Sequence, residues 1–222
     1  MILIINKSKK EAQRLSEMFY FMGVVSYALT PSEALAEIST VYSAVIVMNP
    51  NALADKEDYI YRLRSYANLP TFAISDTIDS IDSIIFDGVI KGSSYASRIL
   101  SYLTNFCVER GLKPPGTYKL AGIDASVHLT TPTYFNRALT YTKTELMILR
   151  TLIATYPTPT KAQLILKYAF KPTRKPELSS IRTHISVMNK KFRDIAERNM
   201  IVLTPSEGYR ILTPEIREAF IT

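Results

Sequence analysis

The sequence predicts an α/β domain with a doubly wound (βα)5 parallel sheet, followed by a smaller, mainly helical domain that ends in a β-hairpin. Three observations support this prediction. Short apolar runs alternate with amphipathic stretches over the first half of the chain, which is the pattern of a parallel sheet covered by helices. A segment rich in glycine and proline follows. The second half then changes to helical spacing and a final pair of strand-like runs.

Five short apolar runs are the predicted strands of the parallel sheet. They are rich in isoleucine, valine and leucine, as doubly buried strands are, and they cover residues 2–5, 24–28, 44–48, 71–74 and 89–90. Helical spacing extends over residues 8–22, 31–38, 58–66 and 94–106. The second helix has a clear start, because Thr30 suits the N-cap, Pro31 the first helical position and Glu33 the third.

The break between the two predicted domains lies at residues 109–117. The glycines and the proline pair within this segment interrupt both helix and strand. We therefore predict domains at residues 1–108 and 118–222, joined by this linker. Directly after it, residues 118–141 alternate apolar and turn residues, which indicates a small antiparallel sheet at the start of the second domain.

Two capping boxes mark the next predicted helices. Thr142 and Glu145 have the spacing in which an N-cap hydroxyl and a carboxylate three residues later satisfy each other's backbone N–H groups. Thr160 and Gln163 have the same spacing and predict the start of a second helix, which extends to about Tyr168.

Residues 179–192 predict a helix with two different faces. One face is an apolar stripe of Ile181, Ile185, Met188 and Phe192. The opposite face carries groups of the kind that contact base edges and phosphates, namely Arg182, Thr183, Ser186, Asn189, Lys190 and Arg193. Residues 200–212 form two strand-like runs around Pro-Ser-Glu-Gly, which is a hairpin signal. A polar helix followed by a hairpin is typical of a DNA-binding winged helix-turn-helix domain.

Charge is distributed unevenly along the chain. The net charge is +7, but residues 1–110 contribute −2 and residues 111–222 contribute +9. A basic half joined to a nearly neutral half favours a polyanion-binding module attached to a different domain. The alternative is an ordinary basic domain that binds no nucleic acid.

The remaining composition indicates a cytoplasmic protein. Cys107 is the single cysteine, so the chain forms no internal disulfide and suits a reducing compartment. No apolar run approaches the ~18 residues that a membrane span needs, and residues 1–5 indicate a strand instead of a signal peptide. No nucleophile–base pair, metal-ligand cluster or glycine-rich phosphate loop stands out, so we expect neither enzymatic activity nor a cofactor.

The whole chain, residues 1–222, resembles a response regulator of the OmpR/PhoB family. Residues 139–149 resemble the opening of that family's first effector helix, residues 184–192 its recognition helix and residues 208–210 its wing. The resemblance implies a receiver-like domain followed by a winged helix that is preceded by a small antiparallel sheet.

The receiver-like domain departs from the family at its phosphorylation site. Asn6 and Lys7 stand where the resemblance implies two acidic Mg²⁺ ligands, and Met48 stands at the position of the phosphoacceptor aspartate. Ser75 and Lys91 match the assisting hydroxyl and lysine, although a strand-end hydroxyl and a surface lysine explain them equally well. Mg²⁺ prefers hard oxygen ligands and methionine has no carboxylate, so we expect an atypical receiver with neither Mg²⁺ nor phosphorylation. The interval between the fourth and fifth strands is also short, which predicts a stub or no helix there.

The recognition helix departs from the family as well. Ser186, Val187 and Asn189 replace groove-facing arginines; asparagine pairs with adenine and valine contacts a thymine methyl, so we expect readout that leans toward A·T pairs. His184 aligns with a phosphate-contacting histidine, or is a half-buried histidine with a structural role. The predicted DNA-binding residues are Arg182, Thr183, His184, Ser186, Val187, Asn189, Lys190, Lys191, Arg193, Tyr209 and Arg210.

These features predict a sequence-specific regulator of transcription that binds double-stranded DNA without phosphorylation. The receiver-like domain would form a homodimer or contact a partner, and the protein would be associated with the nucleoid when bound. The alternative is an adaptor whose winged helix contacts RNA polymerase or another protein instead of DNA. A basic loop of Lys171, Arg174 and Lys175 fits a polymerase contact, a phosphate contact or plain solvation.

Overall fold

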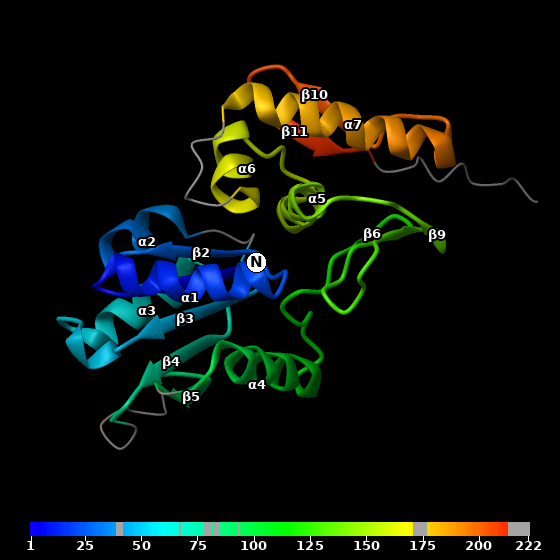
Figure 1. The fold of residues 1–222 in the computed structure, drawn as a ribbon. Coiled ribbons are helices and arrows are strands. Elements are labelled where there is room, and N and C mark those ends of the chain that lie inside the picture. The colour runs from blue at the N-terminus through cyan, green and yellow to red at the C-terminus, as the bar shows by residue number, and fades with distance from the viewer. Residues whose placement is uncertain are drawn as a thin grey trace, which may run out of the picture. The chain divides into compact units, whose positions relative to one another are not determined.

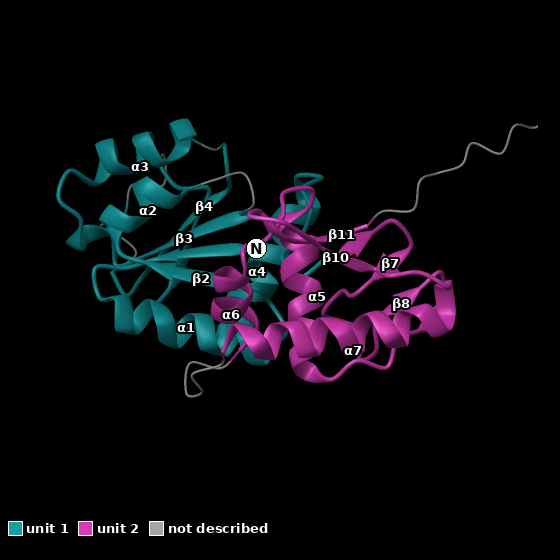
Figure 2. Cartoon of the chain, turned by 90° about the horizontal axis from the view of Figure 1, so that it is seen from above, with its two compact units in different colours: residues 1–117 teal, residues 118–222 magenta. Residues whose placement is uncertain are grey.

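The computed structural model describes residues 1–38, 42–66, 68–77, 81, 85–92, 94–170 and 177–212 (Figure 1). The chain divides into two compact units, Met1–Thr117 and Tyr118–Thr222 (Figure 2). Residues 109–117, the predicted linker, therefore group with the first unit.

The first unit is built on a five-stranded parallel sheet. Its strands are β1 (Ile2–Ile5), β2 (Ser26–Leu29), β3 (Ala44–Met48), β4 (Thr71–Ser75) and β5 (Gly88–Lys91). They lie in the order β2-β1-β3-β4-β5, and every neighbouring pair is parallel. The order reverses direction at β1, which is the mark of a doubly wound sheet, so the predicted fold class is confirmed.

Helices cover both faces of this sheet. They are α1 (Lys9–Phe21), α2 (Pro31–Glu37), α3 (Lys56–Tyr66) and α4 (Ala96–Glu109), with a short 3-10 turn, η1 (Pro50–Ala52), after β3. The helix α1 packs beside α4, and α2 packs beside α3; α2 and α3 lie on the face of the sheet opposite α1 (Figure 2). Strands β1, β2 and β4 are buried along their whole length, because they are covered on both sides.

Two helix termini show how local sequence sets the element boundaries. Thr30 is the N-cap of α2, as predicted, and forms a capping box with Glu33: the Thr30 hydroxyl accepts from the Glu33 N–H, and the Glu33 carboxylate accepts from the Thr30 N–H at 2.9 Å. The second terminus is the C-terminal end of α4. This helix runs three residues beyond Phe106, where the sequence predicted its end. It stops where Gly111 takes a positive φ of 66° and the Leu112 N–H bonds back to the Cys107 carbonyl (2.7 Å), a helix end that glycine favours.

The interval between β4 and β5 bears on the predicted short fourth helix. The described residues there, 76, 77, 81 and 85–87, form turns and bends and no helix. Residues 78–80 and 82–84 lie outside the described part of the chain.

The second unit opens with a small antiparallel sheet and continues as a winged helix, as predicted. Its first four strands, of two residues each, are β6 (Lys119–Leu120), β7 (Ile123–Asp124), β8 (Thr133–Tyr134) and β9 (Arg137–Ala138), in sequence order. Three helices and a hairpin follow: α5 (Lys143–Thr155), α6 (Ala162–Ala169), α7 (Leu178–Ala196), β10 (Ile201–Thr204) and β11 (Gly208–Ile211). The last two strands pair antiparallel and form the wing.

One of the two predicted capping boxes is wrong. Thr142 and Glu145 form theirs at the start of α5. Thr160 instead is buried, its hydroxyl bonds to that of Thr155, and its backbone pairs with Tyr209 of the wing. Backbone pairing with the wing therefore decides the conformation of Thr160, and α6 begins at Ala162 without a side-chain cap.

The buried Arg150 joins α5 to the small sheet. Its Nε donates to the Ala125 carbonyl (2.7 Å) and its Nη2 to the Ser126 carbonyl (3.2 Å). The guanidinium also lies over the Tyr118 ring, 5.8 Å from its centroid. Burial lowers the pKa of Arg150, while the two carbonyls supply the acceptors that a buried cation needs.

Among the described residues, no helix combines the length and the apolar character needed to cross a bilayer.

We expect the second unit to fold without the first, because its sheet, helices and wing share one core. Trypsin should cleave the native chain at the exposed Arg110, and a fragment of residues 112–222 should give a helical circular dichroism spectrum and a cooperative thermal transition. A fragment without regular structure would mean that both units depend on a common core.

Candidate nucleic-acid interface

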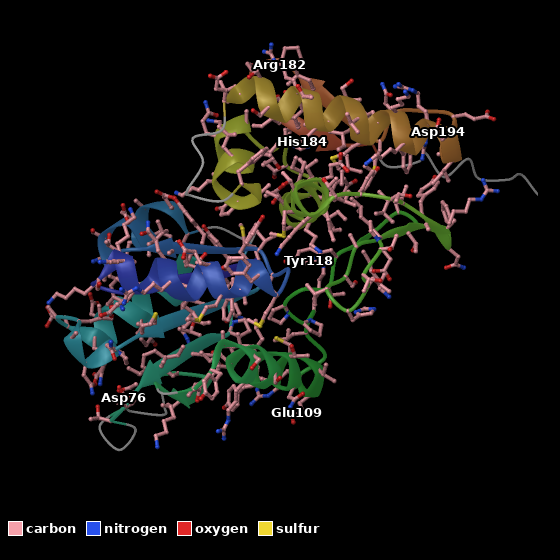
Figure 3. All side chains as sticks on the ribbon, in the orientation of Figure 1. Asp76, Glu109, Tyr118, Arg182, His184 and Asp194 are labelled. Atoms are coloured by element: carbon pink, nitrogen blue, oxygen red, sulfur yellow. The ribbon has the colours of Figure 1, made fainter. Side chains whose placement is uncertain are left out.

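The helix α7 has the two faces that its sequence predicts. The apolar stripe is buried, with Ile181 and Met188 at 0% exposure, Phe192 at 1% and Ile185 at 6%. The opposite side of the helix is exposed and carries Arg182, Thr183, Ser186, Val187, Lys190 and Arg193. We call these six residues the α7 face. Figure 3 shows Arg182 pointing away from the body of the unit.

The α7 face is cationic at both ends and neutral in between. Arg182 lies near the start, and Lys190 and Arg193 lie two to three turns further on. Thr183, Ser186 and Val187 separate them; Val187 is 39% exposed, and the Thr183 hydroxyl donates to the Ser179 carbonyl one turn back (3.2 Å). Arg193 also donates to the side chain of Asn199, and Asp194 adds a carboxylate beside it. The arrangement can hold two phosphates with small groups presented between them.

Asn189 does not belong to this face, so its predicted role as a base reader is wrong. It is buried (7% exposed). Its Nδ2 donates to the Ile201 carbonyl (2.8 Å), and its Oδ1 accepts from the N–H groups of Met200 (3.0 Å) and Ile201 (2.9 Å). The sequence contained a signal for this, since Asn189 follows Ile185 by four residues and precedes Phe192 by three, which places it beside the apolar stripe.

Lys191 is held within the unit as well. Its Nζ donates to the buried Glu145 carboxylate (2.8 Å) and lies 5.7 Å from the centroid of the Tyr141 ring. Burial alone would raise the pKa of Glu145, but hydrogen bonds from Lys191 and from the Thr142 N–H outweigh it, and the pKa is lowered. The Tyr141 hydroxyl donates to the Met188 carbonyl (3.2 Å). Lys191 therefore ties α7 to the start of α5 and is not part of the α7 face.

The two wing residues predicted to contact DNA differ in position. Tyr209 is buried (6% exposed), and its backbone pairs with Thr160, so its predicted DNA contact is wrong for the side chain. Arg210 is exposed beside Val202, its cross-strand partner. Leu203, also in the wing, is 57% exposed. Only Arg210 of the predicted pair lies on the solvent face of the hairpin.

His184 is half-buried, with its ring edge-on to Phe170 (5.6 Å between centroids). Both the phosphate contact and the structural role stay open for it. The basic loop of Lys171, Arg174 and Lys175 lies outside the described residues.

The predicted remnants of a phosphorylation site do gather at one edge of the parallel sheet. Asn6 follows β1, Met48 ends β3, and Ser75 pairs in register with Lys91 at the ends of β4 and β5. The buried Asn6 donates to the Glu11 carboxylate (2.8 Å) and to the Met48 sulfur (4.0 Å). Carboxyl ends of parallel strands are the usual place for a site in such a sheet, but here an amide–thioether contact occupies it.

The other residues of this edge are not joined to that contact. The Lys7 and Lys91 side chains are exposed. Ser75 is buried, and its hydroxyl serves a local turn by accepting from the Thr77 N–H (3.2 Å). Met48 itself offers no oxygen that could accept a phosphoryl group.

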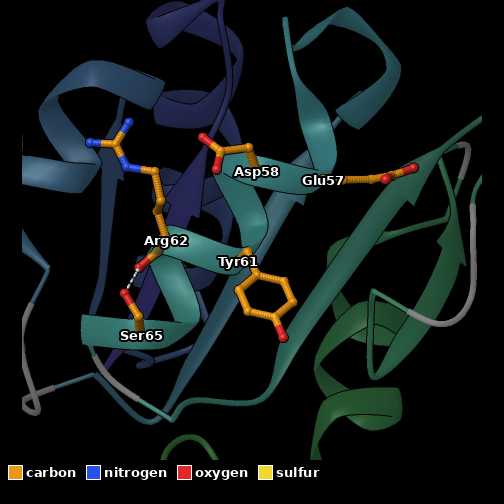
Figure 4. A pocket seen from close by; sticks show the side chains of 5 residues that line it. All are labelled: Glu57, Asp58, Tyr61, Arg62 and Ser65. Atoms are coloured by element: carbon orange, nitrogen blue, oxygen red, sulfur yellow. Dashed lines mark hydrogen bonds between the residues drawn. The ribbon is translucent and has the colours of Figure 1, made fainter.

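Acidic residues nearby form a solvated helix start. Asp58 and Glu57 lie in the first turn of α3 and are exposed, where they line a shallow pocket with Tyr61, Arg62 and Ser65 (Figure 4). Asp55, just before α3, is exposed too. Across the described residues, no three His, Cys, Asp or Glu side chains form a group that could hold a metal ion.

Comparisons with known proteins return structures but no family. No family model matches the chain, and no curated protein matches it. Similar solved structures include a streptococcal redox sensor described as evolved from two-component response regulators, with 16% identity, a TM-score of 0.40 and coverage of 95% of this chain and 98% of that one. Another is the Thermotoga maritima response regulator DrrB, an OmpR/PhoB homologue, with 17% identity, a TM-score of 0.41 and coverage of 95% and 97%.

A third similar structure is the DNA-binding domain of the response regulator AdeR in complex with an intercistronic region. It has 17% identity and a TM-score of 0.40, and it covers 43% of this chain and 99% of that one.

We predict that Asn189→Ala destabilises the protein by roughly 2–4 kcal/mol, because two buried N–H groups and one carbonyl lose their partner. Lys190→Ala, the exposed neighbour, should change stability by less than about 0.5 kcal/mol. Urea unfolding followed by circular dichroism measures both. Wild-type stability in the Asn189 variant, together with loss of DNA sequence preference, would restore the base-reading role.

Proposed function

We propose that this chain is a transcriptional regulator of the OmpR/PhoB class that binds double-stranded DNA sequence-specifically through α7 and the wing. The single observation that carries the proposal is the exposed α7 face, whose cations flank hydroxyl and methyl groups on a helix anchored by a buried stripe. An α-helix of this kind fits the major groove of B-DNA, where phosphate contacts position it and side chains of the middle turn meet base edges.

The residues of the α7 face limit which base pairs the protein can recognise. Val187 suits a thymine methyl, and Thr183 and Ser186 accept or donate to either base of a pair. With Asn189 withdrawn into the core, the helix offers no bidentate partner for adenine, so specificity rests on weaker contacts. Arg210 on the wing adds a further cation, and the net charge of +9 over residues 111–222 favours a polyanion.

The receiver-like unit acts without phosphorylation in this proposal. Asn6 and Met48 contact each other at the ends of β1 and β3. Met48 therefore supplies no carboxylate to accept a phosphoryl group, and Asn6 and Lys7 supply no pair of acidic ligands for Mg²⁺. The unit would then serve to form a homodimer or to contact a partner such as RNA polymerase.

A protein-binding adaptor is the second candidate, and specific residues favour it. Leu203 on the wing is 57% exposed and Val187 on α7 is 39% exposed, which suits an apolar contact. Asp194 and Glu207 place exposed carboxylates on α7 and on the wing tip, where they would repel phosphates.

DNA titrations by fluorescence anisotropy separate the two candidates. If each protomer neutralises about 4–6 phosphates, log K should fall with log salt at a slope of roughly −4 to −5. Arg182→Ala should weaken binding to all sequences alike and flatten the slope by about one unit. Val187→Ala should instead cost on the order of 1 kcal/mol, and only on a duplex selected by the wild-type protein.

The matched control for these titrations is Arg98→Ala, which removes an exposed arginine of α4 in the first unit and should leave binding unchanged. Equal wild-type affinity for selected and scrambled duplexes would contradict a sequence-specific regulator and favour the adaptor.

Acetyl phosphate with Mg²⁺ should leave the intact mass of the protein unchanged, since Met48 cannot form an acyl phosphate. DNA affinity should not respond either. A phosphorylatable response regulator treated in parallel shows that the reagent works, and an acid-labile adduct of one phosphate per chain would contradict the proposal.

A further inference from the structure

A polar pocket of about 330 Å³ lies in the first unit, at the edge where β4 and β5 begin. This is the edge opposite to Ser75 and Lys91. Leu69, Pro70 and Phe106 supply its apolar lining, and Arg64, Asp87 and Arg110 supply its charged groups. The volume is at the lower end of the range for small-molecule sites, so an occupant would be small.

The apolar lining is held in place by the sheet. The Pro70 carbonyl accepts from the Val45 N–H of β3 (2.8 Å). The Leu69 carbonyl accepts from the Thr71 hydroxyl (3.0 Å). Phe106 packs edge-on against the buried Phe72, with 5.0 Å between centroids. These contacts make the pocket largely pre-formed.

Two guanidinium groups converge on the pocket. Arg110 lies over the Phe106 ring, 5.2 Å from its centroid. Arg64 pairs through Nη2 with Asp87, whose carboxylate also accepts from the Thr71 N–H (2.7 Å). The Nε of Arg64 is buried and has no hydrogen-bond partner among the described residues. The Arg64 side chain as a whole is 33% exposed, so a ligand would meet the rest of its guanidinium group and not this atom.

The charges of the lining residues indicate the class of ligand. Arg64, Arg110 and Asp87 sum to +1, so one negative charge neutralises the pocket and a dianion leaves an excess. A carboxylate offers planar oxygens that match guanidinium donors, and the lining of Leu69, Pro70 and Phe106 suits an apolar body.

We propose that this pocket binds a small organic monocarboxylate with an apolar body, whose carboxylate pairs with the guanidinium groups of Arg64 and Arg110. The ligand site lies in the receiver-like unit, away from the edge that holds Asn6 and Met48, and does not depend on DNA binding.

Sodium benzoate is the probe, titrated into the full ¹⁵N-labelled chain and followed by NMR of the arginine Nε–H and backbone N–H groups. We expect saturable shifts of the Arg64 Nε–H signal and of amides around Leu69, Asp87 and Arg110. Benzamide, the neutral isostere, should bind clearly more weakly, and inorganic phosphate should not bind more tightly than benzoate.

Three variants sharpen the test. Arg110→Gln should weaken benzoate binding roughly three- to fivefold, the value of one exposed ion pair. Asp87→Asn should strengthen it, because the competing carboxylate is lost while an acceptor for Thr71 is kept. Arg98→Gln, an exposed α4 residue outside the pocket, should have no effect.

Each opposite result overturns the proposal. Equal binding of benzamide would show that charge plays no part, and tighter binding of phosphate would exclude the monocarboxylate class. Shifts confined to other residues, or none that saturate at tens of millimolar benzoate, would show that this pocket is not a ligand site.

Discussion

The second unit depends on one buried side chain that joins a helix to a hairpin. Asn189 satisfies two backbone donors and one acceptor at the start of β10, so this one amide ties the start of the wing to α7. The wing has a second attachment at Thr160, where Gly208 lies so close that a Cβ atom would come within 2.2 Å of the Thr160 carbonyl oxygen. Burying an amide that makes three hydrogen bonds costs little, whereas leaving the same backbone groups unpaired would be expensive.

The first unit shows that a fold fixes the place where side chains meet but not their chemistry. The parallel sheet brings the ends of β1 and β3 together whatever residues stand there. In this chain those positions hold Asn6 and Met48. The Asn6 amide donates to the Met48 sulfur and to the Glu11 carboxylate. The sheet therefore brings together an amide, a thioether and the Glu11 carboxylate at this point.

Sequence periodicity predicted the elements well and the roles of individual polar residues less well. The parallel sheet, the small sheet, the α7 stripe, the N-cap of Thr30 and the capping box of Thr142 follow from local patterns that tertiary contacts reinforce. Asn189 and Thr160 differ because each is polar yet buried, and the partner of each is backbone that arrives from the wing. Residue type alone suggests exposure for both, and only the long-range pairing shows otherwise.

The net charge of the sequence likewise does not show which cations are free to meet a ligand. Lys191 contributes to the basic total, but its ammonium group is used by Glu145 inside the unit, and Arg150 is buried against two carbonyls. The net charge of the second half therefore overstates the number of cations available to a ligand. Which cations face solvent depends on the helix packing, and the α7 face retains Arg182, Lys190 and Arg193.

The backbone pairing between Thr160 and Tyr209 attaches the wing to the segment that connects α5 and α6. The hairpin is therefore not free to move independently of these helices. A hairpin that is anchored at its base has few conformations to lose when it meets a surface. Docking then costs mainly the rigid-body entropy of the unit, and less the ordering of a loop. Helix and wing would approach a partner as one preorganised template, so its fit to a given surface is decided before contact.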